Sequence, residues 1–250
     1  MTGLVAVVLA AGLGTRLRPL TDVRPKPLCP VADVALLDRA LARVAPYVDA
    51  VAVNAHHLAE QVLAHVGGRA VVSVERHRLL GTAGALGALR RFIDGRPVLL
   101  HNGDAYLTDD LSTLVAGWDG RRPRLLVRTV NGPADFGSRR YVGAALLPGP
   151  AVAGLAAEPA GLYELVWRPA WEAGALEFVE LSGIAVDCGT ARSYLRANLH
   201  ASGGRSVVGR GALVRGTLVR SVVWAGGRVE AEEYLVDAVR TDTGLTVWAR

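Results

Sequence analysis

A short apolar run near the start of the chain ends abruptly in a glycine-rich turn. Residues 4–9 (LVAVVL) are rich in valine, and Ala10-Ala11-Gly12-Leu13-Gly14 follows directly. A run of this length and composition is typical of a strand that is buried on both faces, as in a parallel sheet. The feature predicts an α/β fold with a turn at the carboxyl end of its first strand.

Strand-like and helix-like segments then alternate along the chain. We predict strands at 4–9, 50–53, 70–74, 97–101 and 125–130, and helices at 35–44, 58–66, 84–93 and 191–199. This alternation predicts a mostly parallel central sheet with helices on both faces. Ligands of such folds bind outside the carboxyl ends of the strands. The pattern is less regular between residues 131 and 158, where glycine, proline and alanine dominate.

The character of the sequence changes after Ser202-Gly203-Gly204, which we interpret as a linker. Apolar residues then recur at steps of five or six, with glycines between them: Val208, Val214, Val219, Trp224, Val229 and Leu235. The spacing resembles the hexapeptide repeat of a parallel β-helix, and the alternative is a few ordinary strands. We therefore expect one domain at 1–204 and a short β-helix-like segment at 205–250.

Composition excludes several classes of protein. Hydrophobic residues make up 51% of the 250 residues and charged residues 20%, which excludes a disordered chain. The sequence contains no uncharged apolar run long enough to predict a membrane span. The start of the chain lacks the basic region of a signal peptide. The two cysteines, Cys29 and Cys188, are too few for a disulfide framework and favour a reducing, cytoplasmic compartment. The net charge of +5 comes from scattered arginines, which weighs against nucleic-acid binding.

The glycine turn carries the strongest chemical signal. It lacks the third glycine of a dinucleotide fingerprint and the Gly-Lys-Ser/Thr of a phosphate loop. Instead Arg16 follows the turn, and Lys26, the only lysine of the chain, stands between Pro25 and Pro27. Glycines let backbone N–H groups approach an anion closely, while arginine and lysine supply positive charge to phosphate oxygens. The pattern predicts a phosphate-binding loop.

Two further features stand at predicted strand or helix ends. Asp104 and Asp187 are isolated carboxylates of the kind that Mg²⁺ takes together with substrate phosphates, although either could merely cap a turn. The small residues 80–86 (LGTAGAL) open a predicted helix, so a flat ring could lie against the backbone there. The alternative for that segment is a tight helix entry that packs on the sheet.

Taken together, these blocks resemble the sugar-1-phosphate nucleotidylyltransferases, also called nucleotide-sugar pyrophosphorylases. The resemblance covers about residues 3–200 and rests on LAAGLGTRLRPLT, RPKPLCPV, VNAHHLAEQV, LLGTAGAL, NGDAYL and VDCGTARSYLRA. It is greatest for the compact mannose-1-phosphate guanylyltransferase and N-acetylmuramate-1-phosphate uridylyltransferase branches. The resemblance implies a Rossmann-like nucleotidyltransferase fold, with a short left-handed parallel β-helix appended as in several members.

The resemblance also implies a reaction and a site. An NTP and a sugar 1-phosphate would give an NDP-sugar and pyrophosphate by in-line attack on the α-phosphate with Mg²⁺, and Arg16 and Lys26 would be catalytic. The implied metal ligands are Asp104 and Asp187, and the implied substrate contacts are Lys26, Asp104, Tyr106 and Gly143. The implied nucleotide-binding residues are Leu9, Ala10, Ala11, Gly12, Gly14, Thr15, Arg16, Asn54, Gly81, Thr82, Asn102 and Gly103.

The chain departs from the family in one place. Members usually carry a Glu-Lys-Pro motif after the fifth strand, whereas this chain passes from Asn131 to Arg140 straight into Tyr141, as if a hairpin were deleted. Arg139 and Arg140 could supply positive charge there in place of the motif, but we interpret them as surface residues. The departure leaves two alternatives open: transfer from CTP to a non-sugar acceptor such as phosphocholine or a phosphonate, and an inactive regulatory subunit that binds nucleotide-sugars. In every case the expected partners are small molecules, not nucleic acid or membrane, and the repeat suggests a homo-oligomer.

Overall fold

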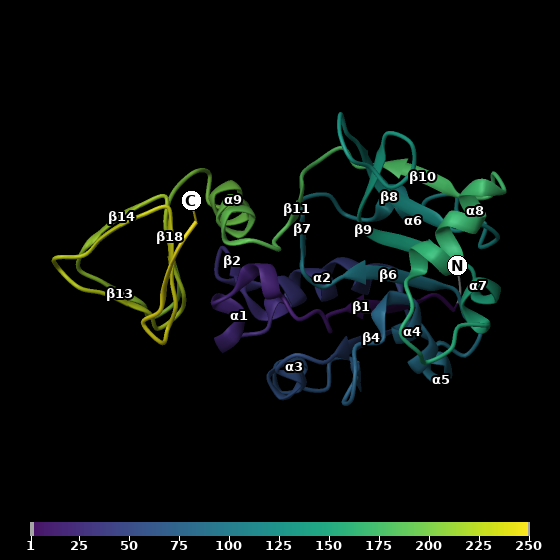
Figure 1. The fold of residues 1–250 in the computed structure, drawn as a ribbon, viewed down its shortest axis with the longest axis horizontal. Coiled ribbons are helices and arrows are strands. Elements are labelled where there is room, and N and C mark those ends of the chain that lie inside the picture. Colours follow the sequence, from purple (N-terminus) through teal and green to yellow (C-terminus); the bar gives the residue numbers. More distant parts are fainter. Residues whose placement is uncertain (1–2, 250) are drawn as a thin grey trace.

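The computed structural model describes residues 3–249 and is built around one seven-stranded sheet (Figure 1). Six strands share one direction, and only β9 runs against its neighbours β6 and β8. The predicted mostly parallel sheet is therefore confirmed. In spatial order the strands are β10 (Glu177–Glu180), β8 (Arg124–Thr129), β9 (Arg139–Leu147), β6 (Val98–Asn102), β1 (Val5–Leu9), β4 (Ala50–Ala55) and β5 (Val71–Val74).

Alternate residues of β1 supply two separate cores. Ala6 and Val8 face one layer of helices, while Val5 and Val7 face the other. The first layer contains α2 (Leu36–Val44), α3 (Ala59–Val66) and α6 (Ser112–Val115), and the second contains α4 (Gly81–Ala88), α5 (Arg90–Ile93) and α7 (Gly149–Ala153). Each fully buried valine contributes about 1.5–3 kcal/mol, which explains why the central strand reads as one apolar run. Beyond α7, a π-helical turn at Tyr163–Trp167 leads into α8 (Arg168–Glu172).

Two predictions for this part of the chain were wrong. The helix expected at 84–93 begins earlier, at Gly81, and is interrupted at Leu89, so that two helices cover the segment. The segment after residue 131, read as irregular, contains β9, one of the central strands. Its two arginines, its run of small residues and Gly143, at φ +109°, hide the usual strand pattern.

Short strands occupy the end of the chain after α9 (Ala191–Ala201), which starts at a capping box formed by Thr190 and Ser193. They form three parallel ladders, drawn in yellow-green as the sides of a triangle in Figure 1. The ladders are β12 (Val207–Val208), β15 (Val222–Val223) and β18 (Ala238–Arg240); β13 (Leu213–Val214) and β16 (Arg228–Val229); and β14 (Thr217–Val219) and β17 (Tyr234–Val236). The last strand, β19 (Thr246–Trp248), runs antiparallel to β18. We call residues 205–249 the C-terminal strand segment.

A third apolar cluster joins this segment to the start of the chain. It unites Leu17, Leu36, Tyr194, Trp224 and Val247, among others, and so combines the loops after β1, α9 and the C-terminal strand segment. The segment is therefore packed onto the part of the domain that carries the glycine-rich loop after β1. None of the helices within residues 3–249 is long and apolar enough to cross a membrane.

Candidate active site

The loop after β1 is closed by its own side chains. Gly14 adopts φ +64°, and an added Cβ there would lie 2.7 Å from the Thr21 methyl carbon. The Thr21 hydroxyl donates a hydrogen bond of 2.9 Å to the Gly14 carbonyl, which holds the loop against α1 (Leu20–Val23). Only glycine combines this left-handed conformation with so close an approach. Gly12, by contrast, has open space beside it, so the backbone there is accessible to a ligand.

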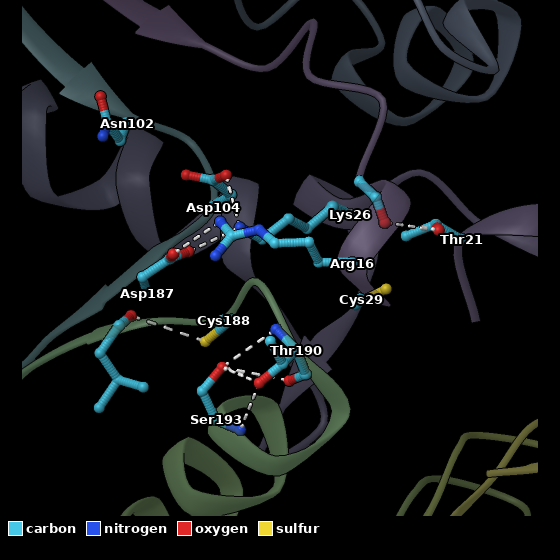
Figure 2. Close-up of polar contacts among 12 residues, drawn as sticks. Arg16, Thr21, Lys26, Cys29, Asn102, Asp104, Asp187, Cys188, Thr190 and Ser193 are labelled. Carbon is cyan, nitrogen blue, oxygen red and sulfur yellow. Dashed lines mark hydrogen bonds and ion pairs between the residues drawn. The ribbon is translucent and has the colours of Figure 1, made fainter. Parts of the chain in front are cut away.

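Lys26 lies between the carboxylates of Asp104, in the turn after β6, and Asp187, at the end of β11 (Figure 2). Its Nζ is 2.7 Å from Asp104 Oδ2 and 2.8 Å from Asp187 Oδ1. The antiparallel pair β7 (Ala105–Leu107) and β11 (Ala185–Asp187) brings these aspartates together, because Asp187 lies opposite Ala105. Arg16 completes the group, with Nη2 3.1 Å from Asp187 Oδ2. Four residues singled out in the sequence therefore form one ion-pair network.

Burial and charge act in opposite directions on this network. Burial alone would lower the pKa of Lys26, but Asp104 and Asp187 outweigh it and hold that pKa above its usual value. Burial alone would raise the pKa of Asp187, but the hydrogen bonds and charges of Lys26 and Arg16 hold it below its usual value. Lys26 therefore stays protonated and Asp187 ionised across the neutral range. Lys26 is suited to binding anions and is not a proton acceptor.

A cavity of about 270 Å³ opens at the carboxyl ends of β1, β4 and β6. It is lined by seven of the residues predicted to bind nucleotide: Leu9, Ala11, Gly12, Asn54, Gly81, Thr82 and Asn102. Asp104 also lines it. We call it the small cavity; Asp104 is the one carboxylate of the ion-pair network that lines it.

Glu75 is a residue of the small cavity that the sequence reasoning missed. Its buried carboxylate accepts hydrogen bonds from the Asn54 side chain at 2.7 Å and from Leu80 N at 2.8 Å. Asn54 in turn accepts a hydrogen bond of 2.7 Å from Ala10 N. This relay joins the phosphate-binding loop to the start of α4. Glu75 directly follows a predicted strand, so the strand-end argument that selected Asp104 could have selected it.

A second cavity of about 620 Å³, which we call the large cavity, adjoins the first. The two share Asn102 and Asp104, and the large cavity also reaches Asp187. Three arginines from different elements line it, namely Arg128, Arg140 and Arg196, together with Tyr141 and Gly143. None of the ion pairs within residues 3–249 involves these arginines. Arg140 is exposed, as expected, and it also borders the large cavity.

Not every predicted site residue lines a cavity. Tyr106 is buried in the third apolar cluster, and its hydroxyl lies 3.0 Å from His200 Nδ1. Its contact with substrate stays a prediction. Gly103 donates from its N–H to the Leu9 carbonyl at 2.8 Å and has a structural position behind the loop. Ala10, Gly14 and Thr15 shape the loop without lining either cavity.

The glycines of α4 divide between two roles. Gly81 lines the small cavity, as predicted. Gly84 and Gly87 instead meet the backbone of residues 156–158: an added Cβ would lie 2.1 Å from the Glu158 carbonyl oxygen or 2.2 Å from that of Ala156. The alternative of tight helix packing is thus correct for the second half of the segment.

The carboxylates fit a divalent cation that is shared with substrate. Asp104 and Asp187 already converge on one positive group, Lys26 Nζ, and both line the large cavity. No cluster of three or more His, Cys, Asp or Glu side chains suited to a metal occurs among residues 3–249. Two convergent carboxylates are nevertheless the donor set that Mg²⁺ uses when substrate phosphates and water supply its other ligands.

Known proteins with similar sequences are sugar-phosphate nucleotidyltransferases. The chain is 40% identical over 131 residues to N-acetylmuramate alpha-1-phosphate uridylyltransferase of Caulobacter vibrioides, which covers 47% of this chain and 54% of that protein. It is 33% identical over 141 residues to glucose-1-phosphate thymidylyltransferase of Streptomyces antibioticus, covering 53% of this chain and 40% of the relative. The chain thus spans about half the length of these relatives.

Solved structures share the fold at low sequence identity. A Thermus thermophilus protein called mannose-1-phosphate geranyltransferase has a TM-score of 0.69 at 19% identity, covering 98% of this chain and 95% of that one. HddC from Yersinia pseudotuberculosis, complexed with GMP-PN, has a TM-score of 0.64 at 18% identity, covering 79% and 99%. The sequence model of the Nucleotidyl transferase family matches residues 5–137, which is more than half of the chain. The matched region includes the glycine loop, Lys26, the small cavity and Asp104, and the chain is a member of the nucleotidyl transferase family.

Proposed function

We propose that this protein transfers a nucleoside monophosphate from an NTP to a sugar 1-phosphate, releasing an NDP-sugar and pyrophosphate. The observation that carries the proposal is the position of Lys26 and its two aspartates. They lie where the small and large cavities meet, since Asp104 lines both. A nucleoside in one cavity and a phosphorylated acceptor in the other would bring their phosphates together beside the same ammonium group.

Positioning and charge account for the chemistry on this proposal. An oxygen of the acceptor phosphate attacks the α-phosphorus, and the bond from that phosphorus to the pyrophosphate oxygen breaks. Lys26 contacts the α-phosphate and the incoming phosphate, and Arg16, two-thirds exposed beside Asp187, faces the charge that develops on the leaving pyrophosphate. The attacking phosphate is already ionised, so no side chain has to remove a proton. Phosphoryl-type transfer depends mainly on such orientation and electrostatic stabilisation.

Asp104 and Asp187 would hold Mg²⁺ together with the substrate phosphates. A bound magnesium ion neutralises charge on phosphate oxygens. Without it, the same two carboxylates orient Lys26 and keep it protonated.

The large cavity favours an acceptor with an acidic group besides its phosphate. Arg128, Arg140 and Arg196 are opposed there by one carboxylate outside the ion-pair network, Asp135, which already accepts a hydrogen bond from Tyr141 N. The Tyr141 hydroxyl is buried with no hydrogen-bond partner within residues 3–249. The Caulobacter relative is named for an acidic sugar phosphate, N-acetylmuramate 1-phosphate. We propose an acceptor of this class, with arginines taking the place of the missing Glu-Lys-Pro motif.

We also propose the assembly suggested by the sequence. Residues 1–204 would form the catalytic domain and residues 205–250 a left-handed parallel β-helix, which the three parallel ladders support. Exposed apolar side chains on that segment, such as Leu213 and Tyr234, support a homo-oligomer. The two cysteines are free and buried, which is compatible with a cytoplasmic protein.

Pyrophosphate release tests the proposal. In the presence of Mg²⁺, each of five NTPs is combined with a neutral sugar 1-phosphate, an acidic sugar 1-phosphate or phosphocholine. The Lys26→Ala variant serves as the blank. We expect release with an acidic sugar 1-phosphate, and a loss of about 10- to 100-fold in Lys26→Ala, because a charge-assisted contact that strengthens in the transition state is removed. Release only with phosphocholine would favour the non-sugar acceptor, and nucleotide binding without release from any pair would favour an inactive regulatory subunit.

A matched pair of variants tests the acidic group. Arg196→Gln removes a charge from the large cavity, whereas Arg192→Gln removes one from the same helix one turn earlier, in a cleft that does not include Asp104 or Asp187. We expect Arg196→Gln to raise KM for the acidic acceptor, with KM for the NTP unchanged, and Arg192→Gln to leave both unchanged. Equal effects of the two variants would contradict the assignment.

A further inference from the structure

The short segment that carries Lys26 is fixed at its first residue by the C-terminal strand segment. The guanidinium carbon of Arg24 lies 4.4 Å from the centroid of the Trp224 ring. Arg24 Nη2 also donates a hydrogen bond of 3.2 Å to Asp242 Oδ2. Trp224 follows β15 and Asp242 follows β18, so two neighbouring strands of one ladder contact the residue two positions before Lys26.

The other end of the same segment is fixed through the same tryptophan. Trp224 Nε1 donates a hydrogen bond of 3.0 Å to the Tyr194 hydroxyl, which in turn donates to the Pro30 carbonyl. Trp224 is 1% exposed and Tyr194 fully buried. Buried partners that are this well satisfied leave the contacted chain little freedom to shift.

The segment between these two ends has no regular structure long enough to hold itself. Residues 26–28 form a single 3₁₀ turn flanked by extended residues. The Lys26 side chain has four rotatable bonds, yet its Nζ meets two carboxylates that are 83 residues apart in the sequence, Asp104 at 2.7 Å and Asp187 at 2.8 Å. Such a contact persists only if the backbone that carries the lysine stays in place, and a displacement of about 1 Å can slow an enzyme by about 100-fold.

We propose that Arg24, Trp224 and Asp242 are positioning residues for Lys26, so that the C-terminal strand segment is part of the active-site support. Arg24 touches neither cavity, and it acts through the Pro25-Lys26 backbone. The catalytic consequence rests on the function proposed above, whereas the effect on Lys26 itself does not.

The chain offers a direct probe, because Lys26 is its only lysine. Acetylation by an acetyl N-hydroxysuccinimide ester at neutral pH, followed by peptide mass spectrometry, reports how often the Lys26 amine is free and accessible. The Lys26 side chain is only 8% exposed while its amine is held by both aspartates, so the amine reacts slowly. The rate is measured without substrate, against an added peptide amine as internal standard.

Three variants and a control define the test. Arg24→Gln and Asp242→Asn each remove one partner of the ion pair between Arg24 and Asp242. Asp242→Glu keeps the negative charge at position 242. Arg215→Ala is the control, because its ion pair with Glu230 at 3.6 Å belongs to the same segment but is exposed and lies beside a different ladder, that of β13 and β16. We expect the acetylation rate to rise about tenfold in Arg24→Gln, in line with the loss of a desolvated cation–π contact. The rate should rise less in Asp242→Asn. It should stay at the wild-type value in Asp242→Glu and Arg215→Ala.

Activity supplies the second measurement. Arg24→Gln is expected to lower kcat about tenfold with KM for the NTP unchanged, since the lysine is displaced while the small cavity is intact. Faster acetylation in a protein without transferase activity would leave the positioning role standing and overturn the proposed function. Wild-type acetylation rates in both folded variants, Arg24→Gln and Asp242→Asn, would overturn the positioning role whatever the activity.

Discussion

Lys26 contacts two aspartates through its ammonium group in the structure, and we propose that it contacts two phosphates during the reaction. Its ammonium is nearly buried, and only the two aspartates offset the cost of removing that charge from water. Replacing the contacts by substrate phosphates exchanges one set of anions for another. The lysine can therefore bind phosphates without a change in its protonation state.

Gly143 forms part of the wall of the large cavity, where there is little room for a side chain. It has φ +109° within β9, and an added Cβ would lie 3.0 Å from the Ala105 Cβ. Gly143→Ala should raise KM for the acceptor by roughly tenfold, the effect of one unwanted methyl group in a fitted pocket. Gly132→Ala, where an added Cβ meets nothing within 4 Å, is the control for steady-state kinetics. An unchanged acceptor KM in Gly143→Ala would show that the acceptor does not lie against this strand.

Individual site residues differ in how far the sequence could predict them. Arg16, Lys26, Asp104 and Asp187 were identifiable because each follows a recognisable strand or a proline-bounded motif, and they do meet in space. Arg196 was not, because its place in the large cavity depends on how α9 packs. Tyr106 was expected at the substrate from the family resemblance, whereas its side chain belongs to the third apolar cluster.

Among the elements, α4 packs closely on the backbone of residues 156–158 because Gly84 and Gly87 have no side chains. Gly84→Ala should lower the free energy of unfolding by about 1–3 kcal/mol, because its methyl group would overlap the Glu158 carbonyl oxygen, 2.1 Å away. Gly154→Ala, at φ −85° with open space around it, should be neutral or slightly stabilising. Urea unfolding of both variants measures the difference. Equal stabilities would mean that α4 does not pack so closely on residues 156–158.

The strand β6 carries a buried titratable group. Burial lowers the pKa of His101 to about 4. Its unfolded-state pKa is near 6.5, so between these values only the unfolded state binds the proton, and stability falls as the pH falls. We expect a loss of about 3 kcal/mol between pH 6.5 and 4 that is absent in His101→Gln. Parallel pH dependences of urea unfolding in the two proteins would refute this account.

Elements with a clear apolar period were predictable, and β9 was not. Valine-rich strands such as β1 and β4 report their burial directly, since both faces are covered. The β9 segment begins with two arginines and continues through Gly143 and two alanines, residues whose presence in a strand is decided by the cavity and by close packing. Its pairing with both β6 and β8 is a property of the assembled sheet.

On the scale of the whole molecule, the sequence changes character near residue 204, but the parts before and after that point share one apolar cluster. Leu17, Tyr194, Trp224 and Val247 belong to one cluster, so neither part buries its apolar surface without the other. Thermal unfolding should therefore be one cooperative transition, with coincident midpoints by far-UV circular dichroism and tryptophan fluorescence. Two separated transitions in calorimetry would show that the C-terminal strand segment folds and melts independently.

The origin of the oxygen atoms in the products tests the proposed transfer most directly. An acidic sugar 1-phosphate labelled with ¹⁸O in its phosphate is incubated with the NTP that supports release, and the products are analysed by mass spectrometry. Attack by the acceptor phosphate on the α-phosphorus predicts that all of the label is found in the NDP-sugar and none in pyrophosphate, and that Lys26→Ala forms little of either product. Label in pyrophosphate, or pyrophosphate formed without a labelled NDP-sugar, would contradict the account.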